Sequence, residues 1–486
     1  MRLRTLLCLI LTVPLSVLRN DVYAQEMWGA ASSNFAGHSG LALNPASIAD
    51  APYRWEVHFL SFDASLVNNY MYLQSRSKLI QKSLSGESLE EDRFTDRYTR
   101  RPDKFGYASA SLNYPSFIWS GKKLSLAFHL STRFEFSASN IPFHFAKYMK
   151  EGFDYDPQQG TSYSTDRARA GLLNWHEAGF TIAGVLYDVP ETYWTGGLTL
   201  NYNYGLNGLF MKLDELDYSV PFDSLLIVND ISAEYGHALP ENGTKGPDGA
   251  FDKRGGGYSL TGGVQFFRNR NMSYYDPCKY KPGDKPYDYR LGFSLIDVGY
   301  LKFTKGTRTF RFTDESADWY GIDTVKFGSL TNLDSTLSKE FLNSYFGSRD
   351  GRSMFVYLPA AISVQYDYAL NGHWFLNFTA IQRVPVGAYG LRRANQLSFT
   401  PRYESRRFEC ALPFSFYEQF RPRIGFALRW GILTLGTDMI SPLLGITDAY
   451  GANFYFGISW KNFSGCDGDG LQMRRRPSIE KCKTPK

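Results

Sequence analysis

Beyond its N-terminal stretch, this sequence of 486 residues lacks any run of about 18 apolar residues, which excludes a membrane-spanning helix. It also lacks a strong charge of either sign. The formal net charge is +5 and no basic stripe is concentrated, so a nucleic-acid partner is not indicated. The five cysteines include no C-x-x-C pair, and the seven histidines have no metal-ligand spacing. No G-x-S-x-G or P-loop motif is present either. The sequence therefore predicts no catalytic residue, metal ion or cofactor, and we expect no enzyme.

The first residues have the pattern of a secretion signal. Arg2 and Arg4 precede a mostly apolar stretch at 6–18, which is too short for a stable spanning helix. Val22-Tyr23-Ala24 follows as a small-residue cleavage site. We therefore predict a signal peptide over 1–24, with a membrane-anchoring helix as the alternative.

The remaining chain is dominated by alternation with a period of two residues. In 450–460, Phe454 and Phe456 share one face with Ile458 and Trp460, whereas polar and small residues fill the other face. Aromatic residues make up 16% of the chain, as interfacial girdles require. Charged residues on the second face suit a wet lumen better than the core of a soluble β-sandwich. The fold class predicted is therefore all-β: a transmembrane antiparallel β-barrel.

The alternation predicts about fourteen strands between residues 54 and 463. They are expected at 54–62, 106–114, 123–137, 174–187, 192–206, 256–268, 286–304, 356–368, 373–385, 395–404, 407–417, 422–430, 432–440 and 450–461. Within 286–304 the apolar residues change from odd to even positions, which predicts a β-bulge near Leu295–Ile296.

Connection lengths predict the orientation of the barrel. Long connections at 63–105, 138–173, 207–255 and 305–355 are expected as external loops, and most turns at the other end are short and periplasmic. Amphipathic patterns predict helical pieces inside two of these loops, at 141–153 and 334–346.

Two segments flank the predicted barrel. Residues 25–53 are rich in small residues, and we expect them to form a luminal plug in which Asn34, Asn44 and Pro45 are gating candidates. The alternative is an N-terminal extension docked under the barrel. Residues 464–486 are expected to be a periplasmic tail, in which Cys466 and Cys482 could pair.

Polar residues on the inner face of the predicted strands are candidates for lining the lumen. These residues are Asn201, Asn203, Asp288, Arg290, Asp367 and Arg429. His129 and Ser131 share a face of a predicted strand, as a lipase pair would, but without an orienting element they are better explained as lumen-facing residues.

Three segments carry a resemblance to known families. The stretch GHSGLALNPASIADAPYRWEVHFLSF, the strand at 293–303 and the closing strand resemble a family of uncharacterised outer-membrane barrels from the Bacteroidetes. Asn44-Pro45-Ala46 is similar to the N-terminal segment of the long-chain fatty-acid transporter superfamily, whose members are fourteen-stranded barrels with an N-terminal plug. Secretion-associated barrels of the same phylum look related too. The resemblance implies no catalytic residues.

These observations lead to a functional expectation. We expect a channel or transporter in the cell outer membrane that passes small, hydrophobic molecules by passive gated diffusion. The alternative is a non-transporting structural or secretion-associated barrel that binds a periplasmic or secreted partner protein. Outer-membrane lipid, lipopolysaccharide and the barrel-assembly machinery are the expected partners in either case.

Overall fold

A computed structural model of the chain describes residues 27–74, 94–96, 103–153, 155–189, 191–240, 252–271, 284–324, 330–418 and 420–463. The predicted signal peptide at 1–24 and the predicted tail at 464–486, with Cys466 and Cys482, lie outside these ranges. Among the described helices, none combines the length and the apolar character needed to cross a bilayer.

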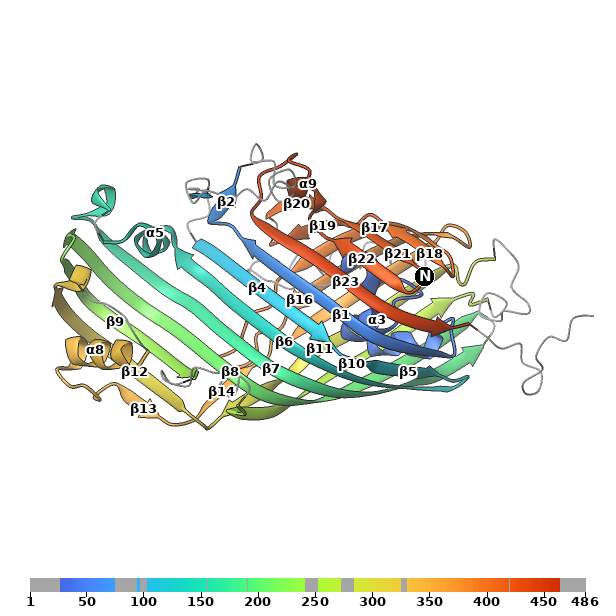
Figure 1. Ribbon diagram of the computed structural model, residues 1–486, viewed down its shortest axis with the longest axis horizontal. Helices are drawn as coiled ribbons and strands as arrows, with labels where there is room; N and C mark the ends of the chain where they lie inside the picture. Colours follow the sequence, from blue (N-terminus) through green and yellow to red (C-terminus); the bar gives the residue numbers. More distant parts are fainter. Residues whose placement is uncertain are drawn as a thin grey trace, which may run out of the picture.

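Fourteen consecutive antiparallel strands form the wall of a closed barrel (Figure 1). In four of these wall strands an irregularity separates two labelled segments. The wall comprises β1 (Trp55–Asn68), β4 and β5 (Asp103–Asn113, Ser116–Ser120), β6 (Leu124–Pro142), β7 (Ser162–Val189), β8 (Thr192–Phe222), β10 (Gly255–Arg268), β11 (Tyr289–Phe303), β14 and β15 (Met354–Tyr357, Ala361–Ala369), β16 (Trp374–Arg383), β17 (Gln396–Glu404), β18 and β19 (Phe408–Ala411, Phe414–Tyr417), β20 and β21 (Phe420–Ile424, Phe426–Trp430), β22 (Leu433–Thr437) and β23 (Gly451–Asn462). Each predicted strand corresponds to one of them.

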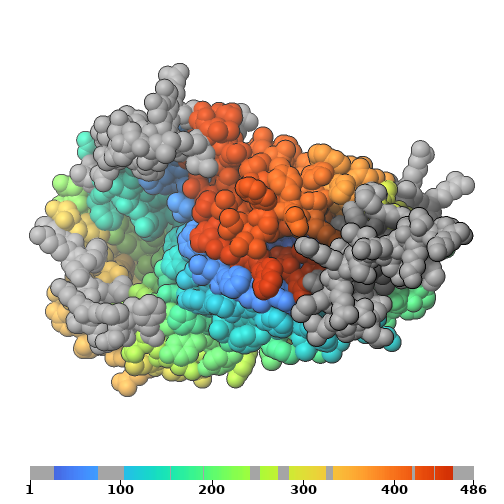
Figure 2. All heavy atoms as spheres, turned by 45° about the vertical axis from the view of Figure 1, so that its right-hand side comes forward, coloured from blue at the N-terminus to red at the C-terminus, as the bar shows by residue number. Residues whose placement is uncertain are grey.

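The barrel closes where the first strand meets the last. β1 pairs with β23 from Trp55↔Asn462 to Val67↔Gly451, and its other edge pairs with β4 and β5. Figure 2 shows this seam as blue residues between the red C-terminal strands and the cyan strands. Closure leaves no open edge between these strands, so the prediction of an antiparallel β-barrel is confirmed.

The alternation of the sequence places apolar residues on the outside of the barrel and polar residues on the inside. On β8, Leu198 and Leu200 are 45% and 55% exposed on the outer face, whereas Thr199 and Asn201 are each 3% exposed on the inner face. The outer face is therefore apolar, as a lipid-facing surface requires, and the polar residues point into the barrel.

The predicted bulge is present on β11. Leu260 of β10 pairs with Val298, but Gly262 pairs with Leu295, so Ile296 and Asp297 together face one residue. Asp297 adopts a positive φ of 52°. Such bulges redirect side chains, and here the bulge buries the Asp297 carboxylate on the inner face.

The sheet extends beyond the barrel at the end with long connections. There β8 continues to Phe222 and pairs with β9 (Leu225–Ala238), which pairs in turn with β12 (Thr307–Tyr320). Helices α5 (Phe143–Glu151) and α8 (Leu330–Leu342) lie at this end (Figure 1) and pack on an aromatic cluster of the extension. The interpretation of 207–255 and 305–355 as loops was therefore wrong for much of their length. The two helices lie where the sequence predicts helical pieces.

The opposite end carries shorter turns. β5 and β6 are joined across Gly121–Lys123, and β21 and β22 across Gly431–Ile432. β1 begins at this short-turn end and β23 finishes there, with the Arg54 amide donating to the Asn462 carbonyl.

Candidate functional site

The segment before β1 lies inside the barrel, at the short-turn end (Figure 1). It consists of the short helices α2 (Trp28–Ala31) and α3 (His38–Leu43) and the 3₁₀-helix η1 (Pro45–Asp50). Most of its residues are buried, with Ala46 and Ile48 fully so. The described part of 25–53 contacts the inner side of the wall, including β7, β8 and β10.

Asn44 holds the middle of this segment. Its Oδ1 accepts a hydrogen bond from the Ala46 amide at 3.0 Å and so caps η1, with Pro45 in the first turn of that helix. Its Nδ2 donates to Gln365 Oε1 at 3.1 Å and to the Val264 carbonyl at 3.3 Å. One side chain thus closes a local turn and fixes that turn to two wall strands.

Inward-facing glycines let the segment approach the wall closely. A Cβ on Gly197 would lie 2.5 Å from the carbonyl carbon of Pro45, and one on Gly263 would lie 2.3 Å from Asn44 Oδ1. Neither position has room for a side chain, because the segment's backbone and its cap occupy it. These glycines place the Asn44-Pro45-Ala46 turn directly on the backbone of β8 and β10.

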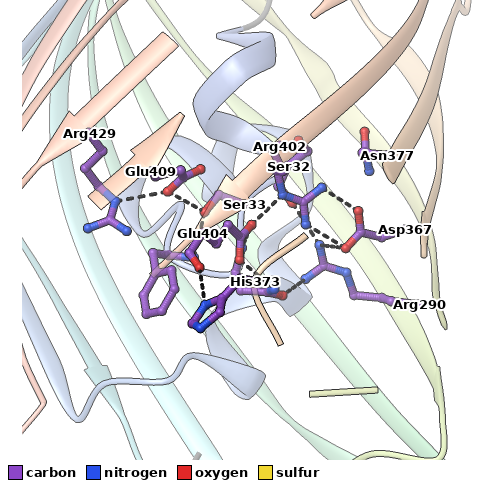
Figure 3. Close-up of polar contacts among 12 residues, drawn as sticks. Ser32, Ser33, Arg290, Asp367, His373, Asn377, Arg402, Glu404, Glu409 and Arg429 are labelled. Atoms are coloured by element: carbon purple, nitrogen blue, oxygen red, sulfur yellow. Dashed lines mark hydrogen bonds and ion pairs between the residues drawn. The ribbon is translucent and has the colours of Figure 1, made fainter. Parts of the chain in front are cut away.

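A buried ionic network holds the beginning of the segment (Figure 3). Arg402 is fully buried and donates to Asp367 at 2.5 and 2.7 Å, and also to Glu404. The Asn34 side chain donates to Glu404 at 2.9 Å, and Asn34 Oδ1 accepts from Arg290 at 3.2 Å. The network therefore connects Asn34 to three strands of the wall.

A second ion pair anchors the neighbouring residue. Arg429 donates to Glu409 at 3.0 Å, and the Ser33 hydroxyl donates to the same carboxylate oxygen at 2.9 Å (Figure 3). Charges that the sequence suggested would be solvated in a lumen are instead satisfied by the N-terminal segment and by one another.

The other predicted lumen residues are placed as follows. Asn201 and Asn203 are buried on the inner face and both donate to Ser259 Oγ. Asp288 differs from the expectation, because it accepts from Asn269 at the exposed end of a strand. Irregular backbone before β11 turns Tyr287 inward instead, where its hydroxyl lies 2.8 Å from Asn34 Oδ1 and 2.5 Å from Asp367 Oδ2 and donates its one proton between them.

Sequence reasoning missed several residues of the inner face. Arg402 and Glu404 alternate with outward residues in a predicted strand, so this alternation could have placed both of them on the inner face. Arg133, Glu177 and Asp297 form a further cluster: Arg133 donates to Asp297 at 2.9 Å and approaches Glu177 at 3.5 Å. The predicted bulge gave a signal for Asp297.

Three adjoining cavities follow the β1 side of the interior. The outer cavity, of about 40 Å³, lies where β1 ends and is lined by Val67 and Phe105. The middle cavity, of about 140 Å³, shares Glu135 and Arg393 with the outer one. The inner cavity, of about 30 Å³, is lined by Glu56 near the start of β1. The row thus follows β1 from near its start to near its end.

The N-terminal segment separates the two cavities nearer the short-turn end. Met27, His38 and Ser39 line both the middle and the inner cavity. The His38 ring stacks on His58 of β1 with a centroid distance of 4.5 Å, and its Nδ1 lies 3.2 Å from Ser116 Oγ. Displacing these residues would join the two cavities.

The interior beside β7, β8 and β11 is filled by apolar side chains. Leu173, Trp175 and Phe303 are fully buried in one cluster there, which includes Leu391 of the connection between β16 and β17. In the same connection, burial and a hydrogen bond to Glu234 raise the pKa of the Tyr389 hydroxyl to about 12. Packing fills this part of the interior, whereas other residues of the same strands, Glu177, Asn201 and Asp297, line the middle cavity.

The middle cavity contains the His129–Ser131 pair considered from sequence. Both residues line it, and His129 Nε2 lies 3.3 Å from Glu177 Oε1. Across the described ranges, no group of three His, Cys, Asp or Glu side chains is arranged to hold a metal ion.

A comparison with protein families identifies the family of this chain. The model of the family of unknown function DUF5723 matches residues 45–438. The chain belongs to this family. The match begins at Pro45 in the N-terminal segment and ends just after β22, so the family model spans most of the barrel. A comparison with curated proteins finds no match.

Solved outer-membrane barrels are similar to this family member in outline. The toluene transporter TodX of P. putida has 11% identity and a TM-score of 0.40, with 92% of this chain and 100% of that chain covered. The toluene transporter TbuX of Ralstonia pickettii has 7% identity and a TM-score of 0.40, covering 91% and 99%. A FadL homologue of Pseudomonas aeruginosa has 10% identity and a TM-score of 0.31, covering 91% and 99%.

Proposed function

We propose that the protein is a passive channel of the bacterial outer membrane, held closed in this conformation by residues 27–53. The observation that carries the proposal is the row of three cavities interrupted by Met27, His38 and Ser39. Hydrogen bonds and ion pairs attach part of the segment to the wall and can be exchanged for water one at a time, whereas Trp28, Leu41 and Ile48 are held by apolar packing. Displacing the segment therefore requires both the exchange of polar contacts for water and the exposure of these apolar side chains, and no enzymatic step is needed.

The side chains that line the cavities indicate which class of solute could pass. Most side chains around the middle cavity are polar or charged, including Asp63, Glu177 and Arg133. A hydrophobic solute would have to strip water from these groups without replacing their hydrogen bonds, which is unfavourable. We therefore propose small polar solutes, and the hydrophobic solute expected from sequence becomes the competing outcome of the test.

Conductance measurements test the plug directly. Deleting residues 27–50 behind an intact export signal should raise single-channel conductance several-fold, because the inner and middle cavities then join. Heat-modifiable migration on gels would show that the barrel still forms. Swelling of liposomes in arabinose, compared with uptake of toluene, separates the two classes of solute. Unchanged conductance in a heat-modifiable deletion variant would rule the plug out.

One observation favours the alternative of a barrel that binds a partner protein. The outer extension exposes large apolar side chains: Met149, Tyr320 and Phe346 are 74%, 70% and 72% exposed. Such residues are expensive to leave in water unless something covers them. If the deletion variant conducts no better than the wild type, and if Met149→Ser with Phe346→Ser abolishes co-purification of a partner, this second function would replace the first.

A further inference from the structure

The middle cavity has the charge and the hydrogen-bonding character of a cation site. Four carboxylates and two guanidinium groups line it: those of Asp63, Glu135, Glu177, Asp297, Arg133 and Arg393. The two arginines converge on Asp297, at 2.9 Å from Arg133 and 3.2 Å from Arg393. Arg133 also lies 3.4 Å from Glu135 and 3.5 Å from Glu177, but the lining still carries two more carboxylates than guanidinium groups.

An unsatisfied acceptor lies in the same wall. Asn201 is 3% exposed and lines the cavity, yet its Oδ1 has no hydrogen-bond partner. A buried carbonyl oxygen without a donor costs about 1–3 kcal/mol, so a bound donor there would recover that energy. This oxygen is a second sign of a ligand, independent of the carboxylates.

His129 lies beside both Asn201 and Glu177, over a glycine. A Cβ on Gly179 would lie 2.3 Å from Asn201 Oδ1 and 2.1 Å from His129 Cε1. His129 in turn lies 3.3 Å from Glu177 Oε1. The space above Gly179 is thus occupied by the His129 ring and the Asn201 amide, and all three of these side chains line the middle cavity.

We propose that the middle cavity binds a small organic cation with N–H donors, a primary ammonium, between Asn201 Oδ1 and the carboxylate of Glu177. The ammonium supplies the donor that the carbonyl lacks and the positive charge that the lining lacks. The cavity of about 140 Å³ has space for roughly five water molecules, and so for an alkylammonium of a few carbons. The inference deepens the proposed function and rests on it for how the cation enters and leaves.

Calorimetric titration of the folded, full-length protein in detergent tests binding without requiring flux. Propylammonium chloride should release heat that saturates, whereas sodium propionate and propanol should not. Tetramethylammonium carries the charge but no N–H donor, so it should bind at least about tenfold more weakly. Heats equal to dilution for propylammonium, or equal affinity for tetramethylammonium, would overturn the proposal.

Variants locate the site. Asn201→Leu removes the acceptor and Glu177→Gln removes the charge, and each should weaken propylammonium binding by about tenfold or more. Asp166→Asn changes an exposed carboxylate of the outer extension and should leave binding unchanged. Equal losses in all three variants would point to surface charge and contradict the site. If wild-type binding follows this pattern while the plug deletion conducts no better than wild type, the binding site stands and the channel fails.

Discussion

Both terminal nitrogens of the Arg402 guanidinium, on β17, donate to the Asp367 carboxylate on β15, at 2.5 Å and 2.7 Å. The two strands are not neighbours in the sheet. β16 lies between them, and the pair crosses it on the inner face. The Tyr287 hydroxyl lies between Asp367 and Asn34 of the N-terminal segment, within hydrogen-bond distance of both. One buried ion pair therefore supports both the wall and the segment that fills it.

Removing the cation of this pair should destabilise the barrel strongly. Arg402→Met leaves the buried carboxylates of Asp367 and Glu404 without their shared partner, and a loss of about 3–5 kcal/mol is expected. Urea titration of folding into lipid vesicles measures it. Arg167→Met, which breaks an ion pair whose side chains are 76% and 65% exposed, should show no measurable change. Equal effects would mean that the buried network contributes no more than a surface pair.

Replacing either of two adjacent glycines of β8 with alanine should affect single-channel conductance differently. Gly197→Ala would place its Cβ 2.5 Å from the Pro45 backbone, so the segment must move and single-channel conductance should rise. Gly196→Ala points outward and meets only Leu186 Cδ1 at 2.9 Å, on a flexible side chain that is 65% exposed, so conductance should not change. The same result for both variants would contradict the seating of Asn44-Pro45-Ala46 on the wall.

An arginine should be costly on the outer face and tolerated at the cavity. Leu200→Arg places a charge on the lipid-facing surface and should cost about 2–4 kcal/mol if the site lies near the membrane midplane. Ser111→Arg points into the middle cavity beside Asp63, where water and carboxylates can accept the charge. Folding titrations in lipid compare the two variants. A larger cost for Ser111→Arg would reverse the assignment of the two faces.

The ends of the barrel should differ in accessibility on living cells. In a cysteine-free background, Glu340→Cys on α8 should react with an impermeant maleimide on intact cells, because the long-connection end is expected to be external. Lys122→Cys in the turn after β5 should react only after the outer membrane is permeabilised. The reverse pattern would invert the topology.

The alternation of neighbouring residues predicted the strands of the barrel wall correctly. Alternation such as Leu198, Leu200 and Tyr202 against Thr199 and Asn201 is local, and it fixed the positions of the strands and the bulge before Asp297. It did not predict how far the strands run. The connection at 207–255 was expected as a loop, but β8 continues into it as far as Phe222 and β9 follows at Leu225–Ala238. Beyond the lipid no apolar outer face is required, so the alternation no longer marks the strand.

Partners distant in sequence could not be predicted. Asn34 was a candidate, yet its partner Glu404 is 370 residues away, and no periodicity connects the two. The same holds for Asn44 and Gln365, separated by 321 residues. Asp288 failed for a local reason: the irregular backbone before β11 breaks the alternation by which it was chosen.

The seam between β1 and β23 sets an order of events during assembly. The N-terminal segment leads directly into β1, and it contacts wall strands from β5 through β22. Once β1 has paired with β23, the segment can reach those contacts only through an end of the closed barrel. Enclosing it while the sheet is still curling avoids that passage. The last strand to be synthesised therefore completes the wall around the part of the folded chain that was made first.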